Sequence, residues 1–402
     1  MHVCFICSHY PPYPTGGVGA VVSDLAKGLI EHGHAVTVAG VCPANWGLER
    51  DRSETIEGVR VIRLTAAPAW MRWRPGMLWD RLRLQRCLNQ AHRQRPFDLV
   101  EAGDGGGWLI WGGGRRYPVN IRAHGSITMF DCLLGNPVDP FVRWLERRAL
   151  QRADYITAVS KFAREQTIET FDLEPRPWPI LYNAVDARMF CPDASVPNEE
   201  GLILFVNGIE PRKGVEELIA AMPHVIQSYP NARLVLVGGD SGPRRDGKPY
   251  RDWLEERLDP RLHPRIEFAG RVARSDALVN YLRRAAVCCF PSHAETFGMA
   301  PVEAMAVGRP VIYMKDGPGP EIIDDGQTGL LCDPKQPHDI ASKILTVLQN
   351  RGLAETLGSN ARAAVLDRFD QPGWIQENIR LWEGYAKRNP AAIAPGGAAE
   401  RK

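Results

Sequence analysis

Short apolar runs alternate with amphipathic stretches along the first half of the chain. Val21, Leu25 and Leu29 recur at helical spacing, so a helix is predicted over Val18–His32, with Gly33 as its stop. Apolar runs that end in polar or glycine-rich loops predict buried strands at His2–Ser8, Ala35–Val41, Asp98–Glu101, Val119–His124 and Tyr155–Val159. Such alternation of strand and helix is typical of parallel sheets with crossover helices.

The same rhythm starts again in the second half. Strands are predicted at Leu202–Val206, Ala232–Val237, Arg265–Phe268, Ala286–Phe290 and Val311–Tyr313, and helices at Val215–Tyr229, from a Ser275 cap to Arg284, and at Met299–Val307. Between the halves, Cys191–Gly201 is poor in core-forming residues and contains two prolines, which indicates a linker.

A chain of 402 residues is too long for one ordinary core, so the predicted fold class is α/β with two Rossmann-like, doubly wound domains. We assign residues 1–195 to the first domain and 200–371 to the second. Pro372 permits a further helix over 372–388, where Ile375, Ile379, Trp382 and Ala386 recur at helical spacing and Trp374 and Tyr385 flank them. Residues 389–402 are rich in Pro, Gly and Ala and are expected to form a disordered tail. In doubly wound folds the ligand lies at the carboxyl ends of the strands, which places the active site in the cleft between the domains.

Composition narrows the classes of function. Hydrophobic residues make up 44% and charged residues 24% of the chain, and the formal net charge of +2 is too balanced to indicate nucleic-acid binding. No apolar run is long enough to span a bilayer, and the start of the chain lacks the features of a signal peptide, so a cytoplasmic location is expected. The nine cysteines, which include Cys4 and Cys7 in one predicted strand, are expected to be buried, reduced thiols.

The segment from Phe290 to Ala306 carries the strongest chemical signal. Glu295 lies in a loop after a strand, and Glu303 follows eight residues later, about one turn into a helix. The backbone N–H groups of Phe297, Gly298 and Met299 stand at the start of that helix, where they can donate to hydroxyl or phosphate oxygens. Carboxylates accept hydrogen bonds from vicinal hydroxyls, so the arrangement is suited to a sugar or ribose.

A second signal follows another predicted strand, in the sequence from Asn207 to Gly214. Lys213 stands beside a glycine at a helix start, which suits a diphosphate because a point charge and free N–H groups meet there. Arg212 could add a second cation. The alternative for Arg212 is a solvated residue that points away from the ligand.

Two weaker signals lie in the first half. Gly16 and Gly17 stand between a predicted strand and helix, where glycines let a ligand approach the backbone. The neighbouring glycines lack the last Gly of a dinucleotide-binding fingerprint, so a nicotinamide-dependent dehydrogenase is not favoured. His124 ends a strand in the sequence His-Gly, a position that faces the expected cleft. Glu101 stands at the end of a neighbouring predicted strand and Asp104 follows it, and Asp104 is a candidate for contact with an acceptor.

The two-Glu segment resembles the E-x-F-G-x-x-x-x-E signature of glycosyltransferase family 4, whose members are retaining nucleotide-sugar transferases with the GT-B fold. The resemblance covers nearly the whole chain. It implies that Glu295 lies against the donor sugar and that Glu303 binds the ribose hydroxyls. It also implies that the first domain lies on the acceptor side, that the second domain binds the donor, and that the closing helix packs back on the first domain.

The resemblance extends to the other signals. It implies that Lys213 binds the donor diphosphate, that Gly16 and Gly17 form a loop facing the donor phosphates, and that His124 contacts the donor sugar. The chain departs from the family at one point: where the family has an Arg upstream of the lysine, this sequence has Gly208. Arg212 is the candidate for the missing cation.

We find no acidic triplet of the D-x-D type and no His/Glu pair at metal spacing on a helix, so a metal-independent transferase without a cofactor is expected. From Trp70 to Arg95 the chain has seven Arg and one Asp among three tryptophans. This segment could contact an anionic membrane surface or a phosphorylated acceptor. The simpler interpretation is an exposed helix pair with structural tryptophans.

The function predicted is transfer of a hexose-type sugar from a UDP- or GDP-sugar to a glycan, lipid-linked or small-molecule acceptor, as in polysaccharide biosynthesis. His124, Lys213 and Glu295 are the candidate catalytic residues. Gly16, Gly17, Arg212, Phe297, Gly298, Met299 and Glu303 are the candidate binding residues. A nucleotide-sugar epimerase or hydrolase of the same fold and a non-catalytic nucleotide-sugar-binding protein remain alternatives.

Overall fold

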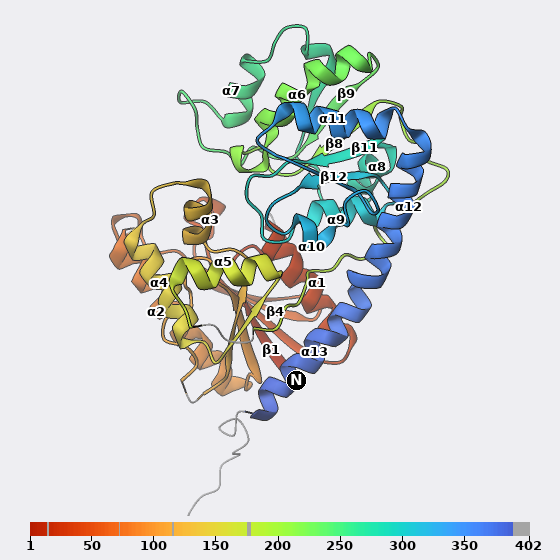
Figure 1. The fold of residues 1–402 in the computed structure, drawn as a ribbon. Helices are drawn as coiled ribbons and strands as arrows, with labels where there is room; N and C mark the ends of the chain where they lie inside the picture. The colour runs from red at the N-terminus through yellow and green to blue at the C-terminus, as the bar shows by residue number, and fades with distance from the viewer. Residues whose placement is uncertain (14–15, 72, 115, 175–177, 389–402) are drawn as a thin grey trace, which may run out of the picture. The chain divides into compact units, whose positions relative to one another are not determined.

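The computed structural model describes residues 1–13, 16–71, 73–114, 116–174 and 178–388. The chain divides into two compact units (Figure 1). The first comprises Met1–Tyr182 with the chain from Pro372 onward, and the second comprises Asn183–Gln371. Within the described part of the chain, no helix combines the length and apolar character needed to cross a membrane. The predicted tail, 389–402, lies outside the described residues.

The first unit is built on a seven-stranded sheet. Its strands, in spatial order, are β3 (Arg52–Ile56), β4 (Val59–Thr65), β2 (Ala35–Cys42), β1 (His2–Ile6), β5 (Leu99–Gly103), β6 (Val119–Ala123) and β7 (Tyr155–Ala158). The pairings are parallel apart from the β3–β4 hairpin. The order reverses at β1, which makes the sheet doubly wound and leaves the carboxyl ends of β1, β2, β5 and β6 at one edge.

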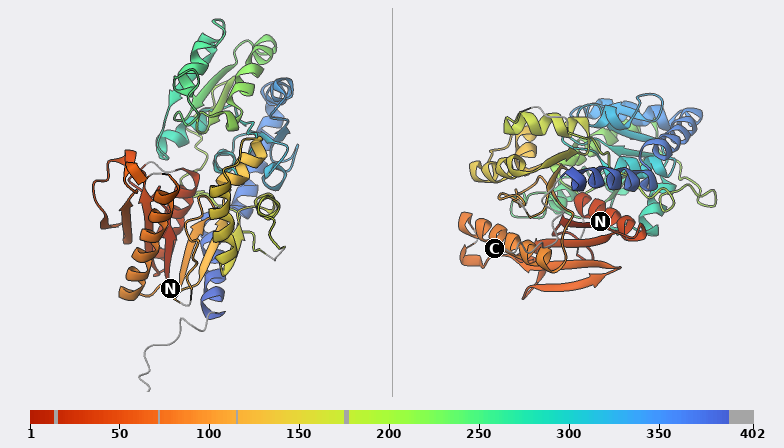
Figure 2. Two further views of the ribbon diagram at one scale, coloured as in Figure 1. Left: turned by 90° about the vertical axis from the view of Figure 1, so that its left-hand side faces the viewer. Right: turned by 90° about the horizontal axis from the view of Figure 1, so that it is seen from below.

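Helices cover both faces of this sheet. They are α1 (Gly17–Glu31), α2 (Arg74–Gln94), α3 (Ile127–Leu134), α4 (Pro140–Arg152), α5 (Lys161–Phe171) and α13 (Gln371–Arg388), with 3₁₀ turns η1 (Ala44–Trp46) and η2 (Ala69–Met71). The α1 helix buries Val21, Leu25 and Leu29 as its apolar periodicity predicts. It lies beside α13 (Figure 2), and a Cβ on Gly28 would come within 2.1 Å of Ile375 Cδ1. Leu84 and Leu88 of α2 pack on the core of the opposite face.

The α13 helix docks on the first unit through a polar core as well as apolar contacts. Its buried positions are Gln371, Trp374, Ile375, Asn378, Trp382 and Tyr385. Ile375 and Trp382 of the predicted stripe are buried, as are the flanking Trp374 and Tyr385, whereas Ile379 and Ala386 are only half-buried. Asn378 takes the buried position because Arg122 Nη2 donates to its Oδ1 (2.5 Å) and its Nδ2 donates to the Trp374 carbonyl (2.8 Å).

The second unit has a six-stranded sheet that is parallel in each of its pairings. In spatial order the strands are β10 (Ile266–Gly270), β9 (Arg233–Val237), β8 (Leu202–Val206), β11 (Val287–Phe290), β12 (Val311–Met314) and β13 (Leu330–Cys332). The helices are α6 (Val215–Ser228), α7 (Tyr250–Glu256), α8 (Asp276–Arg284), α9 (Met299–Ala306), α10 (Gly319–Ile322), α11 (Pro337–Leu348) and α12 (Arg351–Arg368), with turns η3 (Pro211–Lys213) and η4 (His263–Arg265). The predicted parallel α/β architecture is confirmed in both units.

The boundary between the units differs from the one expected. The predicted linker at 191–201 lies inside the second unit, which begins at Asn183. The segment before that linker is held there by the N–H of Val185, which donates to the Phe369 carbonyl (2.9 Å), and by Arg362, which donates to the carbonyls of Ala187 (3.0 Å) and Phe190 (2.8 Å). The composition of the sequence identifies the stretch poorest in core-forming residues. The start of the second unit depends instead on these long-range hydrogen bonds, which composition does not reveal.

Three local predictions need correction. The Ser275 side chain does not cap α8; its hydroxyl donates to the Ala273 carbonyl instead (3.2 Å). The first strand ends at Ile6, so Cys7 lies in the loop that follows and not on the strand face opposite Cys4. All nine cysteines are among the described residues and none forms a disulfide, but Cys132 is exposed, contrary to the expectation that all are buried.

Candidate functional site

Two loops of the second unit approach each other at the carboxyl ends of neighbouring strands. The loop after β8 contains η3 and Gly214, and the loop after β11 begins at Pro291. Gly214 has φ +71°, and a Cβ there would lie 1.8 Å from the Pro291 carbonyl oxygen, so only glycine allows this approach. The N–H of His293 donates to the Arg212 carbonyl (2.8 Å), which ties the loops together.

Lys213 and Glu295 form a buried ion pair between these loops. The side chains are 9% and 11% exposed, and Lys213 Nζ donates to Glu295 Oε1. Burial lowers the pKa of Lys213, and the Glu295 carboxylate opposes that effect in part. Burial raises the pKa of Glu295, but the charges of Lys213 and Arg212 outweigh burial and hold it below its ordinary value. The structure therefore brings together two of the three predicted catalytic residues.

Arg212 points toward the same carboxylate. Its Nη1 lies 3.8 Å from Glu295 Oε2 and donates to the Ala294 carbonyl (3.1 Å), while Nη2 donates to Glu210 Oε1 (2.7 Å). The alternative in which Arg212 turns away into solvent does not hold. At the position of the family arginine, a Cβ on Gly208 would come within 2.3 Å of Ser241 Oγ.

The start of α9 depends on a glycine. Gly298 has φ +91°, and a Cβ there would lie 2.4 Å from the hydroxyl oxygen of Tyr313. That hydroxyl donates to the Phe297 carbonyl (3.2 Å) and so stabilises the turn before α9. Gly298 is the N-cap of α9 and supplies no side chain, so polar backbone groups rather than a capping side chain stand at the helix start before Met299.

Glu303 lies in α9, one turn after Met299, as the sequence predicts. It is 7% exposed, and its Oε1 accepts a hydrogen bond from Arg274 Nε (2.8 Å). Sequence reasoning missed Arg274, which lies in the loop between β10 and α8. An arginine in a loop carries no periodicity, and the only signal for it was its position after a strand that ends at the same edge of the sheet.

The first unit has a pocket of about 420 Å³ at the carboxyl edge of its own sheet. His124 lines it directly after β6, together with Asp104 after β5. The His124 and Gly125 N–H groups donate to Asp104 Oδ1 (2.9 and 3.1 Å). Burial, assisted by the charge of Arg122, lowers the pKa of His124 to about 3, so the imidazole is neutral at physiological pH.

The glycine loop before α1 leaves open space. Gly16 is the N-cap of α1 and Gly17 its first residue, and a Cβ on either would meet no atom of the described chain within 4 Å. Gly19 differs, because a Cβ there would lie 2.3 Å from the His9 carbonyl oxygen. Packing therefore requires Gly19, whereas Gly16 and Gly17 leave room for a ligand. Residues 14 and 15 of this predicted loop lie outside the described residues.

Glu101, noted in the sequence beside Asp104, is part of the core. It is 4% exposed and accepts hydrogen bonds from Arg122 Nε (2.8 Å), Asn120 Nδ2 (2.7 Å) and Trp382 Nε1 (3.0 Å). Its role is to hold α13 against β5 and β6.

The described residues of the basic segment 70–95, which are all but residue 72, form one α-helix, α2, after η2, and not a helix pair. Trp70 and Trp73 are 83% and 78% exposed, so these two are not structural tryptophans. Arg81 is buried and donates to the carbonyls of Gly107 (2.9 Å) and Met77 (2.7 Å), so it does not belong to the basic surface.

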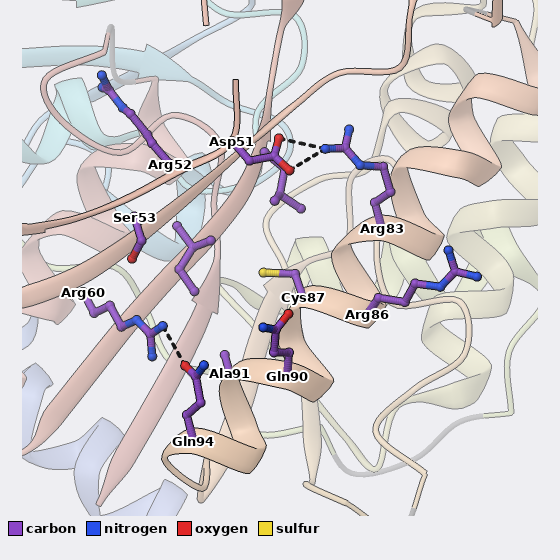
Figure 3. Close-up of a pocket in the computed structure, with 12 residues that line it drawn as sticks. Asp51, Arg52, Ser53, Arg60, Arg83, Arg86, Cys87, Gln90, Ala91 and Gln94 are labelled. Atoms are coloured by element: carbon purple, nitrogen blue, oxygen red, sulfur yellow. Dashed lines mark hydrogen bonds and ion pairs between the residues drawn. The ribbon is translucent and has the colours of Figure 1, made fainter. Parts of the chain in front are cut away.

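Further along α2, a surface pocket of about 450 Å³ lies against β3 and β4 (Figure 3). Arg83 Nη2 and Asp51 Oδ2 form an ion pair there (2.6 Å), and Arg60 donates to Gln94 Oε1 (3.0 Å). In Figure 3 the Arg86 side chain points away from Arg60 and Gln94.

Comparison with known proteins decides the family. A model described as "Glycosyltransferase Family 4" matches residues 15–188, and one described as "Glycosyl transferases group 1" matches residues 192–364. The chain belongs to glycosyltransferase family 4. The matched residues cover both units and contain the Lys213–Glu295 and Arg274–Glu303 pairs.

Full-length relatives agree with this family-4 assignment. The chain is 27% identical to an uncharacterised glycosyltransferase of Methanocaldococcus jannaschii, over 95% of this chain and 98% of that protein. It is 26% identical to a glycogen synthase of Mycobacterium tuberculosis, over 92% and 91% of the two chains. The first is named as a glycosyltransferase, and this family-4 protein is a glycosyltransferase.

Solved structures confirm the expected GT-B fold. Sucrose-phosphate synthase from Thermosynechococcus elongatus superposes with a TM-score of 0.82 over 95% of this chain and 98% of that chain, at 24% identity. Anabaena HepE in complex with UDP-glucose gives a TM-score of 0.73 over 96% and 100% of the two chains, at 21% identity. At these identities the likeness establishes the fold.

The buried Asp104 carboxyl makes a testable contribution to stability. Burial, together with the nearby Glu146, raises its pKa to about 7. Because this lies above the unfolded value of about 3.9, the stabilisation is complete below about pH 4 and is lost as the pH rises through 7. We expect the free energy of unfolding of the wild type, relative to that of Asp104→Asn, to fall by about 2 kcal/mol between about pH 5 and pH 8.

Urea unfolding of both proteins at a series of pH values measures this difference. The Asn side chain does not titrate, and the opposing contribution of His124 is common to both proteins and cancels. Parallel stability curves for the two proteins would show that Asp104 titrates at its ordinary pKa.

Proposed function

We propose that this glycosyltransferase takes a hexose-type sugar from a nucleotide-diphosphate donor and transfers it with retention of anomeric configuration. The observation that carries the proposal is two ion pairs with buried carboxylates, Lys213–Glu295 and Arg274–Glu303, at the carboxyl edge of one parallel sheet. Family resemblance supports the retaining outcome. The UDP-glucose named in the HepE complex supports a nucleotide-sugar donor.

Stabilisation of the leaving group is the main catalytic effect proposed. Lys213 and Arg212 would face the departing diphosphate, with the N–H groups around Gly298 at the positive end of α9. When the diphosphate enters, its charge competes with Glu295 for both cations, which frees that carboxylate to accept a hydrogen bond from the donor sugar. Glu303 would accept from the ribose hydroxyls, and Arg274 holds its carboxylate in place.

Two residues of the first unit complete the proposal. Neutral His124 would donate to or accept from a sugar hydroxyl rather than carry a charge, because burial disfavours the imidazolium. Gly16 and Gly17 would bring backbone N–H groups to the donor phosphates. Both assignments follow from the family resemblance.

We also propose that transfer needs no metal ion, because cationic side chains and a helix start can offset the diphosphate charge. Activity in excess EDTA is expected to stay within about twofold of the untreated rate, and added Mg²⁺ or Mn²⁺ should not raise it. Loss of activity in EDTA that Mg²⁺ restores would contradict this expectation.

The exposed end of α2 is proposed as a peripheral membrane contact. Trp70 and Trp73 are exposed beside Arg74, whose guanidinium lies 5.8 Å from the Trp73 ring centroid. Aromatic and basic side chains together favour the interface of anionic bilayers. Sedimentation with phosphatidylglycerol vesicles should fall in the Trp70→Ser/Trp73→Ser double variant and not in Trp111→Ser, an exposed tryptophan outside the segment. Equal sedimentation of both variants would contradict the contact.

A thermal-shift screen of UDP-, GDP- and ADP-sugars tests the proposed function. A donor at 100 times its dissociation constant adds about 2.7 kcal/mol of stability. Product analysis with the donor so found then separates the alternatives. Free sugar formed without any acceptor-dependent product indicates a hydrolase or epimerase. Binding without slow donor hydrolysis indicates a binding protein.

A further inference from the structure

Short side chains on α2 leave a pocket between this helix and the β3–β4 hairpin (Figure 3). Cys87 and Ala91 stand four residues apart, so they lie on one face of the helix. Ile62 and Leu64 of β4 stand two residues apart, so they also share a face, and both are buried. These four residues help to line a pocket of about 450 Å³, a volume typical of sites for small molecules.

Arginines dominate the charged residues of the lining. Four of the lining residues are Arg and one is Asp: Arg52, Arg60, Arg83, Arg86 and Asp51. The Cys87 thiol adds no negative charge at physiological pH, because burial raises its pKa above the ordinary value. The pocket is therefore basic, although the formal net charge of the chain is only +2.

Carboxylates already engage two of these arginines. Arg83 Nη2 donates to both carboxylate oxygens of Asp51 (2.7 and 2.6 Å). Arg52 Nη2 lies 3.4 Å from Glu54 Oε1, and in Figure 3 the Arg52 side chain points away from Cys87. Neither arginine is therefore counted as a free charge for a ligand.

Arg60 and Arg86 differ, because neither forms an ion pair with a carboxylate of the described chain. Arg60 donates to Gln94 Oε1 (3.0 Å), which is a neutral acceptor. Arg86 is exposed at the rim, where its long side chain can turn over the opening. Two guanidinium charges thus lack a carboxylate. A phosphate monoester, which carries a charge of about −1.5 to −2 at pH 7, would offset both.

The neutral part of the lining favours an organic body on that phosphate. Buried Ile62 and Leu64 offer an apolar floor, which suits the face of a ring or a hydrocarbon part. Ser53 is paired with Ile62 in the hairpin register, so its hydroxyl belongs to the same side. With the amide of Gln90, it can hydrogen-bond to polar groups of the ligand.

This pocket lacks the anchors that a membrane surface needs. Trp70 and Trp73, the aromatic residues of the proposed membrane contact, precede α2. Arg83 lies nine residues after Arg74, which is about 14 Å along the helix. Among the described residues that line the pocket, no large apolar side chain is exposed. A soluble ligand therefore suits the pocket better than a bilayer does.

We propose that this pocket binds a small, soluble organic phosphate, whose phosphate group lies against Arg60 and Arg86 and whose ring or hydrocarbon part packs on Ile62 and Leu64. The pocket belongs to the first unit, whereas the proposed diphosphate site around Lys213 belongs to the second. The inference goes beyond the proposed function and does not depend on it, because it requires no transfer of a sugar.

Phenyl phosphate and inorganic phosphate are the probes, titrated calorimetrically into the full-length protein at low ionic strength. We expect phenyl phosphate to bind at least about fivefold more tightly than inorganic phosphate, because its ring is removed from water on the apolar floor. Benzyl alcohol, which has the ring without the charge, should show no measurable binding.

Arg60→Gln is the decisive variant and should weaken the binding of phenyl phosphate about tenfold. Arg86→Gln, a change on the exposed rim, should weaken it about threefold. Arg93→Gln is the matched control: it removes an exposed arginine of α2 outside the pocket lining, and binding should not change. Lys213→Met removes a charge from the proposed diphosphate site and should also bind phenyl phosphate as the wild type does.

Three results of these titrations would overturn the site: no binding of phenyl phosphate, wild-type affinity in both Arg60→Gln and Arg86→Gln, or loss of binding in Lys213→Met. Sedimentation with phosphatidylglycerol vesicles should be equal for Arg60→Gln and the wild type. Loss of vesicle binding in Arg60→Gln would assign the pocket to a lipid headgroup and overturn the soluble ligand. The donor screen tests the transferase proposal separately, so the two can fail independently.

Discussion

Replacing Lys213 by Met is expected to lower kcat for donor cleavage by about 10²- to 10³-fold, the usual effect of removing one charged or hydrogen-bonding group that faces a developing negative charge. Lys213 is buried and directed at Glu295, so Met keeps the volume while it removes the charge. Donor binding should weaken less than kcat falls, because leaving-group charge is greatest in the transition state.

Release of the nucleoside diphosphate from the donor measures this effect. Lys335→Met removes an exposed lysine of the same unit and serves as the control, which should keep the wild-type rate. Thermal unfolding of Lys213→Met checks that the protein is folded, since the change takes from the buried Glu295 carboxylate the charge of its nearer cation. A folded Lys213→Met variant with kcat near that of wild type would remove leaving-group stabilisation from the mechanism.

Replacing Glu101 by Ala should destabilise the first unit by about 3–5 kcal/mol, because it leaves Arg122 as an unpaired buried charge. Arg122 is fully buried, and its Nε lies 2.8 Å from Glu101 Oε1. The same carboxylate accepts a hydrogen bond from the Trp382 indole N–H, so the Glu101→Ala substitution also removes a contact that holds α13 on the sheet. Burial of both partners makes this ion pair far more consequential than a surface pair.

Urea unfolding followed by tryptophan fluorescence measures the loss. Glu256→Ala is the matched control: its ion pair with Lys248 is about half exposed on each side, and its removal should change stability by less than about 1 kcal/mol. Equal stability of Glu101→Ala and wild type would mean that apolar contacts alone hold α13.

The fold was largely predictable because its elements follow from hydrophobic periodicity. The α1 helix and the β8 strand came directly from their apolar patterns, and parallel order followed from alternation. The start of the second unit and the burial of polar residues in α13 were not predictable in this way. Both depend on polar groups such as Asn378 and the carbonyl of Ala187, which become buried only through partners distant in sequence.

The candidate site was predictable where the spacing of charged residues in the sequence agrees with the resemblance to the family signature. Glu295, Glu303 and Lys213 were found because a strand, a loop and a helix start fix their positions locally. Arg274 was missed because its pairing with Glu303 spans the tertiary structure. Asp104 was noted only as a candidate for acceptor contact. Neither its burial nor the lack of a hydrogen-bond partner for its Oδ2 among the described residues can be predicted from the order of residues in the sequence.

Nucleotide binding by the second unit is the property on which the proposed function depends most. Titration calorimetry with UDP, GDP and ADP on the wild type and on Glu303→Ala tests it directly. We predict one site for at least one of these nucleotides and a dissociation constant raised about tenfold or more in Glu303→Ala, because the ribose hydroxyls lose their charged acceptor. The same dissociation constant in both proteins, or no binding of any of the three nucleotides, would contradict the account.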